Sequence, residues 1–264
     1  MSTVTTSVDR PVTSSFVADT WLVMVRELKP TVRNPFSVVF SMIQPLFFLG
    51  LFGPLLVSVS DQSTADTLQV FVPGILVMSV LFAASTTGSN LLLEIQTGSH
   101  ERMLVTPLSR SSLLVGRALK EIVPLAAQAA LIVAVVIPFG FSLHLGGALI
   151  GLVLLAAFGV GLGALSYTLA LAVKTNDWMF WLVQQTLIFP LLILSGMLLP
   201  VEEGPGWLRT LSKFNPLTHI VDAERLLFDG VVDDRHVLYG TLSALGLAVV
   251  GLVVGVRAMH RATA

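Results

Sequence analysis

The sequence predicts an all-α integral membrane protein with six transmembrane helices, and three observations support this fold class. Hydrophobic residues make up 54% of the 264 residues and charged residues only 12%, whereas about 25% of the residues in an average soluble domain are charged. None of the 15 Lys and Arg or 16 Asp and Glu residues lies in six long apolar stretches. Each stretch has at least 20 residues, which is enough for a helix to cross the hydrocarbon core of a bilayer.

The composition also argues against several functional classes. A soluble enzyme, a nucleic-acid-binding protein and a disordered regulator would all need a larger share of polar residues. The net charge of -1 provides no basic field, so no nucleic-acid partner is expected. Because the chain has no Cys, it can form neither a disulfide nor a thiolate metal site.

The six apolar stretches are expected to be helices because lipid offers the backbone no hydrogen-bond partners. Five spans are the main alternative. A flexible tail is expected at residues 1–15, followed by a single transmembrane domain at residues 16–264. The predicted spans are about 36–57, 68–93, 122–143, 145–173, 178–200 and 237–256.

The distribution of Lys and Arg predicts that both termini are cytoplasmic. In that orientation, 11 of the 15 Lys and Arg residues lie in inside segments and 4 in outside segments. An excess of Lys and Arg on the cytoplasmic side is the usual determinant of membrane topology.

Residues 15–34 precede the first span and carry an apolar stripe with helical spacing. Trp21, Leu22 and Val25 belong to the stripe, while Arg26 and Lys29 fall on the other face. This pattern predicts an amphipathic helix in the headgroup region of the cytoplasmic leaflet. The helix is either a simple anchor or an anchor that also contacts a cytoplasmic partner.

Residues 94–121 join the second and third spans on the cytoplasmic side. A Gly and a Pro delimit a short amphipathic helix at Ser99–Thr106, with Ser99 as its expected N-cap and Arg102 on its solvent face. Residues 103–105 form an apolar knob. A short helix of this kind suits docking into a groove of another protein, and a solvated loop is the alternative.

Residues 201–236 separate the fifth and sixth spans and are expected outside. Asn215-Pro216 indicates a helix start, and Gly230 suits its C-terminal cap. This helix and a shorter piece around Trp207 have apolar faces that need cover, so both are expected to be re-entrant helices in the outer leaflet. The acidic residues of the segment are expected to form a solvated face: Glu202, Glu203, Asp222, Glu224, Asp229, Asp233 and Asp234.

The sequence lacks recognisable catalytic motifs. There is no GxxxxGK[ST] phosphate loop, no HExxH, no GxSxG and no His spacing typical of a metal site. We therefore expect no catalytic residue, no metal site and no cofactor bound by this chain. No carboxylate lies inside a predicted span, which disfavours an ion-coupled transporter that works alone. A structural membrane protein without a transported substrate is a further alternative.

Amide and aromatic side chains within the spans are candidates for a substrate path. Such amides also hold transmembrane helices together, and Phe rings also face lipid or the core, so both interpretations stay open. The candidates are Gln44, Phe47, Phe48, Gln184, Gln185 and Phe189. Close helix packing is predicted at two runs of small residues, which contain Gly159, Gly161, Gly163, Gly246, Gly251 and Gly255.

The order of these segments resembles the membrane subunits of type-2 ABC exporters, in particular the daunorubicin-resistance-type drug-export permeases of actinobacteria. The resemblance covers the chain from about residue 16 onward. Its most specific part is the loop sequence GSHERMLVTPLSRSSLLVGR, above all residues 101–107 and Arg110. The sequences PGILVMSVLF from Pro73 and NPLT at residues 215–218 support it.

The resemblance implies that the loop after the second span is a coupling helix, which docks on a separate ATP-binding subunit that holds ATP and Mg. The implied docking residues are Glu94, His100, Glu101, Arg102, Leu104 and Thr106, with a second contact at Trp21, Arg26 and Lys29. The outer segment would act as a gate, formed by Trp207, Phe214, Asn215 and Phe228.

The resemblance further implies an assembly of two copies of this chain, a homodimer, with two ATP-binding subunits in a bacterial plasma membrane. The expected cargo is a hydrophobic, drug-like or antibiotic-like small molecule, and lipids surround the spans. Export of a lipid or of a lipid-linked glycan is the alternative. Only two Tyr and four Trp are available for stacking against sugars, which argues mildly against the glycan.

Overall fold

A computed structural model describes residues 15–33, 36, 39, 42–59, 63–105, 108–174, 176–197, 201 and 204–262, without the side chains of residues 100, 101, 104 and 262. Over these residues every regular element is a helix, which confirms the all-α class. The predicted tail at residues 1–15 lies outside the described part except for Ser15. In chain order the helices are α1 (Phe16–Arg33), α3 (Ile43–Val59), α4 (Thr64–Gln96), α5 (Ser99–Leu104), α6 (Arg110–Lys120), α7 (Ile122–Val136), η1 (Ile137–Phe139), α8 (Leu145–Val173), α9 (Asp177–Leu194), α10 (Gly206–Ser212), α11 (Pro216–Phe228) and α12 (Arg235–Ala262).

Five helical segments of the described residues are long and apolar enough to cross a membrane. They correspond to the second to sixth predicted spans: Thr64–Gln96, Arg110–Phe139, Leu145–Val173, Asp177–Leu194 and Arg235–Arg261. The predicted fourth span has the same bounds as α8. The first predicted span, 36–57, corresponds to the shorter apolar helix Ile43–Val59 and to residues that are only partly described. Six spans therefore stay a prediction.

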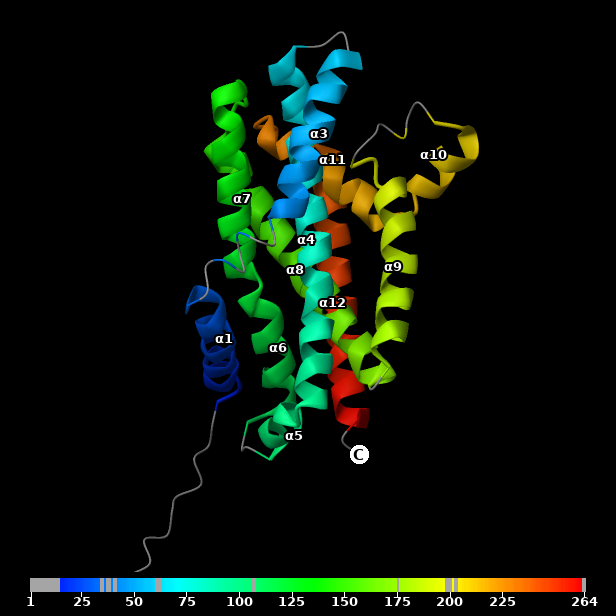
Figure 1. Cartoon of the computed structure of the whole chain (residues 1–264). Helices are drawn as coiled ribbons and strands as arrows, with labels where there is room; N and C mark the ends of the chain where they lie inside the picture. The colour runs from blue at the N-terminus through cyan, green and yellow to red at the C-terminus, as the bar shows by residue number, and fades with distance from the viewer. Residues whose placement is uncertain are drawn as a thin grey trace, which may run out of the picture.

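Helix α4 forms the centre of the bundle and packs against α3, α7, α8, α9 and α11 (Figure 1). Its middle is apolar on all sides, and residues 71–81 are buried without interruption. A helix that is hydrophobic all round is one that neighbours or lipid surround completely. The sequence of α4 thus explains its central place.

Glycines bring α8 and α12 into close contact. A Cβ atom added at Gly251 would lie 2.2 Å from the carbonyl oxygen of Gly161, and one added at Gly161 would lie 2.7 Å from the backbone nitrogen of Ala248. This confirms the predicted close packing for these two glycines, because only a residue without a side chain lets the two backbones approach so far. Gly246 differs, since nothing lies within 4 Å of an added Cβ.

Helix α11 packs on α4, α8 and α12 at the end of the bundle that is opposite to α5 (Figure 1). The side chain of Asn215 accepts a hydrogen bond from the backbone N–H of Leu217, and Pro216 occupies the first turn. Gly230 follows the helix with a φ angle of 82°, a conformation that favours glycine. Both predicted ends of this helix are confirmed.

Candidate functional site

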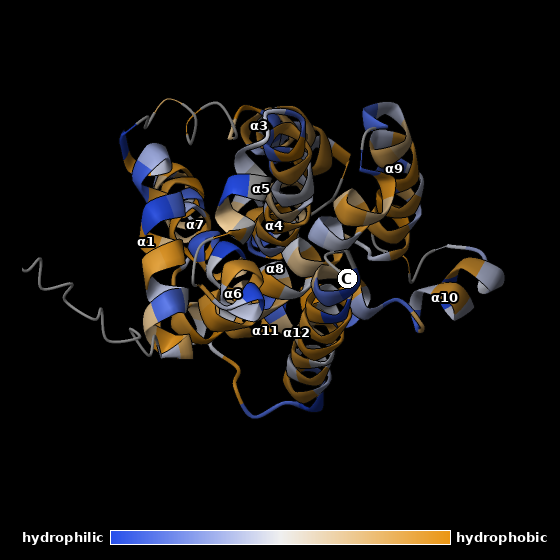
Figure 2. Cartoon of the chain, turned by 90° about the horizontal axis from the view of Figure 1, so that it is seen from below, coloured by the Kyte–Doolittle hydropathy of each residue, from blue (hydrophilic) through white to orange (hydrophobic). Residues whose placement is uncertain are grey.

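Helix α1 lies crosswise at the side of the bundle, next to α6, whereas the long helices are seen nearly end-on in the same view (Figure 2). Val23 is buried against Gly116, whose added Cβ would lie 2.8 Å from Val23. Trp21 is 62% exposed, and the side chains of Arg26 and Lys29 are exposed as well; we call this exposed part of α1 its free face. The predicted helix is confirmed. Its buried residues are Asp19, Thr20 and Val23, and the stripe residues Trp21, Leu22 and Val25 are exposed, as are Arg26 and Lys29.

A polar contact ties α1 to the start of α6. Asp19 is buried, and its Oδ2 accepts a hydrogen bond of 3.3 Å from the backbone N–H of Ser109. The side chain of Ser109 in turn accepts from the backbone N–H of Ser112 and caps α6. Along the chain, α5 therefore lies between α4 and α6, and the start of α6 is held to α1 by this hydrogen bond.

Helix α5 occupies the turn between α4 and α6, at the lower end of the bundle in Figure 1. The expected N-cap at Ser99 is wrong: Gly98 is the N-cap, and its left-handed φ of 67° provides the sharp turn without a side-chain hydrogen bond. Arg102 is exposed, as predicted. The residues of the predicted apolar knob do not share one surface, because Met103 is buried and Val105 is 85% exposed.

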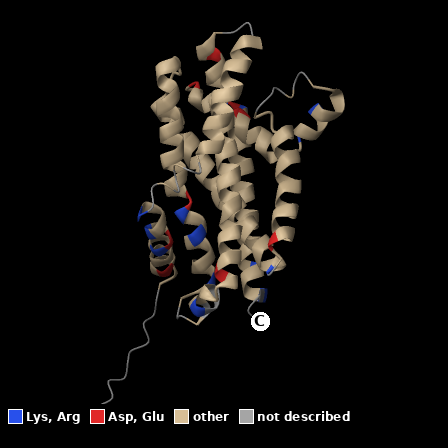
Figure 3. Ribbon diagram, viewed as in Figure 1, with Lys and Arg blue, Asp and Glu red and all other residues tan. Residues whose placement is uncertain are grey.

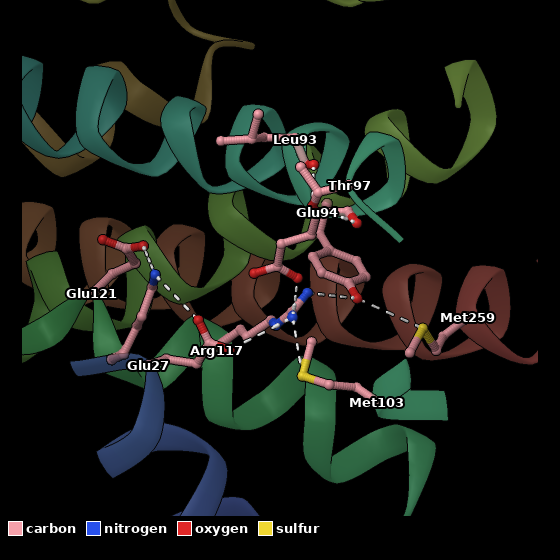
Figure 4. A network of polar contacts seen from close by, with 10 residues as sticks. Glu27, Leu93, Glu94, Thr97, Met103, Arg117, Glu121 and Met259 are labelled. Atoms are coloured by element: carbon pink, nitrogen blue, oxygen red, sulfur yellow. Dashed lines mark hydrogen bonds and ion pairs between the residues drawn. The ribbon is translucent and has the colours of Figure 1, made fainter. Parts of the chain in front are cut away.

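The guanidinium group of Arg117 on α6 connects the elements around α5 (Figure 4). Its Nη2 forms an ion pair with Glu94 of α4 and lies 3.5 Å from Oε1 of Glu27 of α1. Its Nη1 donates to the hydroxyl of Tyr167 of α8 over 3.2 Å, and Nη2 contacts the sulfur of Met103 of α5 at 3.7 Å. We call these five residues the Arg117 cluster.

A second basic residue extends the cluster along α6. Nζ of Lys120 lies 3.9 Å from Oε2 of Glu27 and 3.8 Å from Oε1 of Glu121. The hydroxyl of Thr87 on α4 donates to the same Glu121 oxygen over 3.2 Å. Such a network of charge-assisted hydrogen bonds holds helices in one relative position, since removal of a partner leaves a buried charge unpaired.

Charge distinguishes the two ends of the bundle. Most of the Lys and Arg side chains gather on α1, on α5 and α6 and at the C-terminal end of α12, near the end that carries α5 (Figure 3). The exposed groups of this end include Arg26, Lys29 and Arg102. The α5 end thus offers a surface of exposed cations, underlaid by the buried Arg117 cluster.

The predicted docking residues differ in their surroundings. Glu94 points to Arg117 and its side chain is 25% exposed, whereas Arg102 is open to solvent. His100, Glu101 and Leu104 belong to α5, but their side chains lie outside the described part, as does the whole of Thr106.

Sequence reasoning missed Arg117, Glu27 and Tyr167, although one signal was present. In α6 the buried apolar residues Leu113 and Leu114 precede Arg117 by four and three positions, so all three share one face of the helix. A charge on the apolar face of an amphipathic helix indicates a buried partner of opposite charge.

The substrate-path candidates occupy two helices that both pack on α4. On α3, Gln44 and Phe47 are exposed, and Phe48 stacks on Phe52 with ring centroids 5.4 Å apart. On α9, Gln185 and Phe189 are exposed, whereas Gln184 is only 6% exposed. Of the three amides, only Gln184 therefore points into the protein.

The outer-gate candidates also fall into two groups. Trp207 of α10 and Phe214 are 65% and 82% exposed. Asn215 is buried, and its Nδ2 donates to the carbonyl of Leu191 over 2.8 Å. Phe228 is buried as well, with its ring centroid 5.8 Å from that of Phe141.

Glu224 contradicts the expectation of a solvated acidic face. Its side chain is fully buried in α11 against Gly151 of α8, and neither carboxylate oxygen has a hydrogen-bond partner among the described residues. Burial raises the pKa of Glu224 to about 8. The expectation failed because the buried face of α11 was assigned from its apolar residues alone. Glu224 follows Ile220 by four positions and therefore lies on the same buried face as the apolar residues.

Known proteins resemble this chain over most of its length. The ABC-2 type transporter family matches residues 18–228. The daunorubicin resistance ABC transporter permease protein DrrB1 of Streptomyces coeruleorubidus is 25% identical over 232 residues, which are 87% of this chain and 82% of the relative. The putative transport permease ycf38 of Cyanophora paradoxa is 30% identical over 223 residues, or 82% and 77% of the two chains. The probable multidrug ABC transporter permease YbhR of Escherichia coli (strain K12) is 24% identical over 159 residues, or 60% and 43%.

The family match includes α1 from residue 18 onward, all five residues of the Arg117 cluster, and the helices of the opposite end up to α11. Among the described residues, no group of three or more His, Asp or Glu side chains could hold a metal ion. The structure and the comparisons together confirm the resemblance found in the sequence. The chain belongs to the ABC-2 type transporter family and is a membrane permease subunit of an ABC transporter.

Proposed function

We propose that this chain is the membrane subunit of an ATP-driven exporter that moves a hydrophobic, drug-like molecule out of a bacterial cell. A separate ATP-binding subunit, present in two copies, binds ATP and Mg and docks on α5 and on the free face of α1. Two copies of this chain form the membrane part. The names of two relatives, which refer to daunorubicin resistance and to multidrug transport, support the class of cargo.

The observation that carries the proposal is the Arg117 cluster. One guanidinium group contacts α1 through Glu27, α4 through Glu94, α5 through Met103 and α8 through Tyr167. A displacement of α5 or α1 would therefore act directly on two central helices of the bundle. A docking segment needs such a rigid connection if it is to bias the conformation of the membrane part.

The proposed mechanism follows from this connection. Closure of the two partner subunits on ATP and Mg would push on α5, and the Arg117 cluster would pass the motion to α4 and α8. The helices at the opposite end, α10 and α11, would then separate to open an outer gate at Trp207, Phe214, Asn215 and Phe228. The positive charge near the α5 end supports a cytoplasmic location for this end and for both termini.

Substitution of the exposed cation on α5 tests the proposal. Arg102→Glu should abolish the coupling of ATP hydrolysis to export in a co-purified complex, without unfolding the bundle. Arg235→Glu makes the same change at an exposed position at the start of α12 and serves as the control, for which hydrolysis and export should stay coupled. Unaltered export by the Arg102→Glu variant would contradict the docking role of α5.

A further inference from the structure

A cavity of about 430 Å³ lies between α4, α8 and α9. Its volume falls in the range of about 300–1,000 Å³ that is typical of small-molecule sites. Most of its lining is apolar, with contributions from Leu81 of α4, Leu165 of α8 and Ile188 of α9. No Asp, Glu, Lys or Arg is among the lining residues, so the cavity provides no partner for a charged ligand.

One polar group in this cavity has an unused hydrogen-bonding atom. Gln184 is buried, with only 6% of its surface exposed, and its Oε1 has no hydrogen-bond partner among the described residues. A buried amide oxygen without a hydrogen-bond partner destabilises a protein because it has lost its bonds to water without replacement. Such a group is expected to be satisfied when a ligand is bound.

The neighbouring hydroxyl groups cannot satisfy Gln184, because each already donates to the backbone. Ser85 donates to the carbonyl of Leu81 over 2.7 Å, and Ser166 donates to the carbonyl of Ser85 over 2.8 Å. The hydroxyl of Thr168 donates to the carbonyl of Ala164 over 2.8 Å. The three hydroxyl donors of the cavity are therefore committed to the backbone, so a ligand that pairs with the amide oxygen of Gln184 has to bring the donor.

The cavity is accessible from the surface that a membrane would cover. Leu187 of α9 is 59% exposed and Ala172 of α8 is exposed, and both line the cavity. An apolar molecule dissolved in the bilayer could therefore enter between α8 and α9.

We infer that this cavity binds a neutral, apolar molecule that carries one hydrogen-bond donor, such as a hydroxyl group, which donates to the amide oxygen of Gln184. A lipid acyl chain fits the apolar lining but has no donor, so it would leave the amide unsatisfied. That the bound molecule is also the exported one rests on the proposed function. The binding of such a molecule to this cavity does not depend on the proposed function.

A pair of probes with the same ring system, one with a hydroxyl donor and one with that hydroxyl methylated, tests this inference. Tritiated 2-naphthol and 2-methoxynaphthalene are bound to the full chain in lipid nanodiscs, and empty nanodiscs give the partitioning into lipid. We expect saturable binding of 2-naphthol, tighter than that of 2-methoxynaphthalene on the order of tenfold, because one buried hydrogen bond separates the two. Absence of saturable binding, or equal affinity for both probes, would overturn the inference.

Two substitutions assign the discrimination to Gln184. Gln184→Leu should bring the two affinities within about twofold of one another, whereas Gln185→Leu, which changes the exposed neighbouring amide, should leave the discrimination intact. Ala172→Trp should block the entrance and weaken both probes while Gln184 stays in place. Tenfold discrimination that survives in the Gln184→Leu variant would overturn the assignment.

The binding assay needs neither ATP nor a partner subunit. Discrimination by the nanodisc-embedded chain, together with a failure of Arg102→Glu to affect export, would therefore contradict the proposed docking role and leave the binding site in place. Equal affinity of the wild-type chain for both probes, together with export that Arg102→Glu abolishes, would contradict the binding site and leave the proposed docking role in place.

Discussion

The buried carboxyl group of Glu224 leads to a prediction about how the free energy of unfolding depends on pH. Its carboxyl group is fully buried between α11 and α8, and its two oxygens have no hydrogen-bond partner among the described residues. Burial disfavours the charged form and raises the pKa from its ordinary value of 4.5 to about 8. Helix α11 lies outside the five candidate spans, so this acid belongs to the proposed re-entrant segment.

The direction of the pH dependence follows from proton binding. Between the two pKa values the folded chain holds a proton on Glu224 that the unfolded chain has lost, so the free energy of unfolding falls as the pH rises. The contribution is fully present below about pH 4.5 and is lost as the pH passes about 8. The full interval corresponds to roughly 5 kcal/mol at about 1.36 kcal/mol per pKa unit, and about 3 kcal/mol of it is lost between about pH 6 and pH 8.5.

Glu224→Gln removes this titration while it keeps the size of the side chain. We expect the wild-type chain to lose on the order of 5–10 °C of apparent Tm between about pH 6 and pH 8.5, relative to the Gln variant. Thermal unfolding in mild detergent measures this difference. Asp229→Asn, at the exposed end of the same helix, is the control and should keep the wild-type slope. Parallel pH profiles for the wild-type and Glu224→Gln proteins would refute the reasoning.

Three further predictions concern thermal unfolding in the same detergent. Gly251→Ala should destabilise the bundle by roughly 1–3 kcal/mol because its new methyl group meets the backbone of α8, while Gly246→Ala, which faces open space, should be neutral or stabilising by up to about 1 kcal/mol; equal effects would contradict the packing of α8 on α12. Arg117→Met should cost about 3–5 kcal/mol because two carboxylates lose their buried partner, and an unchanged Tm would show that the cluster does not hold α1 and α4 together. Without ligand, Gln184→Leu should stabilise the chain by roughly 1–3 kcal/mol and Gln185→Leu should have little effect; a destabilised Gln184→Leu variant would indicate a structural partner for this amide.

The elements that the sequence predicted well are those whose signals are local. The bounds of α8 follow from an apolar run between His144 and Lys174, and the start of α11 follows from Asn215-Pro216. The first span was harder to place, since the helix at Ile43–Val59 is short. Helix α5 begins after Gly98 rather than at a Ser cap, because glycine can adopt the left-handed turn that leads the chain out of α4.

The candidate site was predicted only in its exposed part. Arg102 lies on the solvent face that the amphipathic pattern indicated, and Trp21 of the predicted apolar stripe is exposed as well. The Arg117 cluster depends on contacts between residues that are far apart in the chain, such as Glu27 with Arg117 and Arg117 with Tyr167. Charge and spacing in a single sequence do not reveal such pairings. The same holds for Glu224, whose burial depends on the close approach of α11 to Gly151.

The central claim is that α5 contacts a separate ATP-binding subunit, and site-specific photocrosslinking tests it most directly. Val105 is 85% exposed next to α5, and Phe214 is 82% exposed at the opposite end, so p-benzoylphenylalanine at either position leaves the core undisturbed. In intact cells, we predict that the photoreactive group at position 105 forms an adduct with a protein that contains a phosphate-binding loop, and that the group at position 214 does not. No such adduct from position 105, or the same adduct from position 214, would contradict the account.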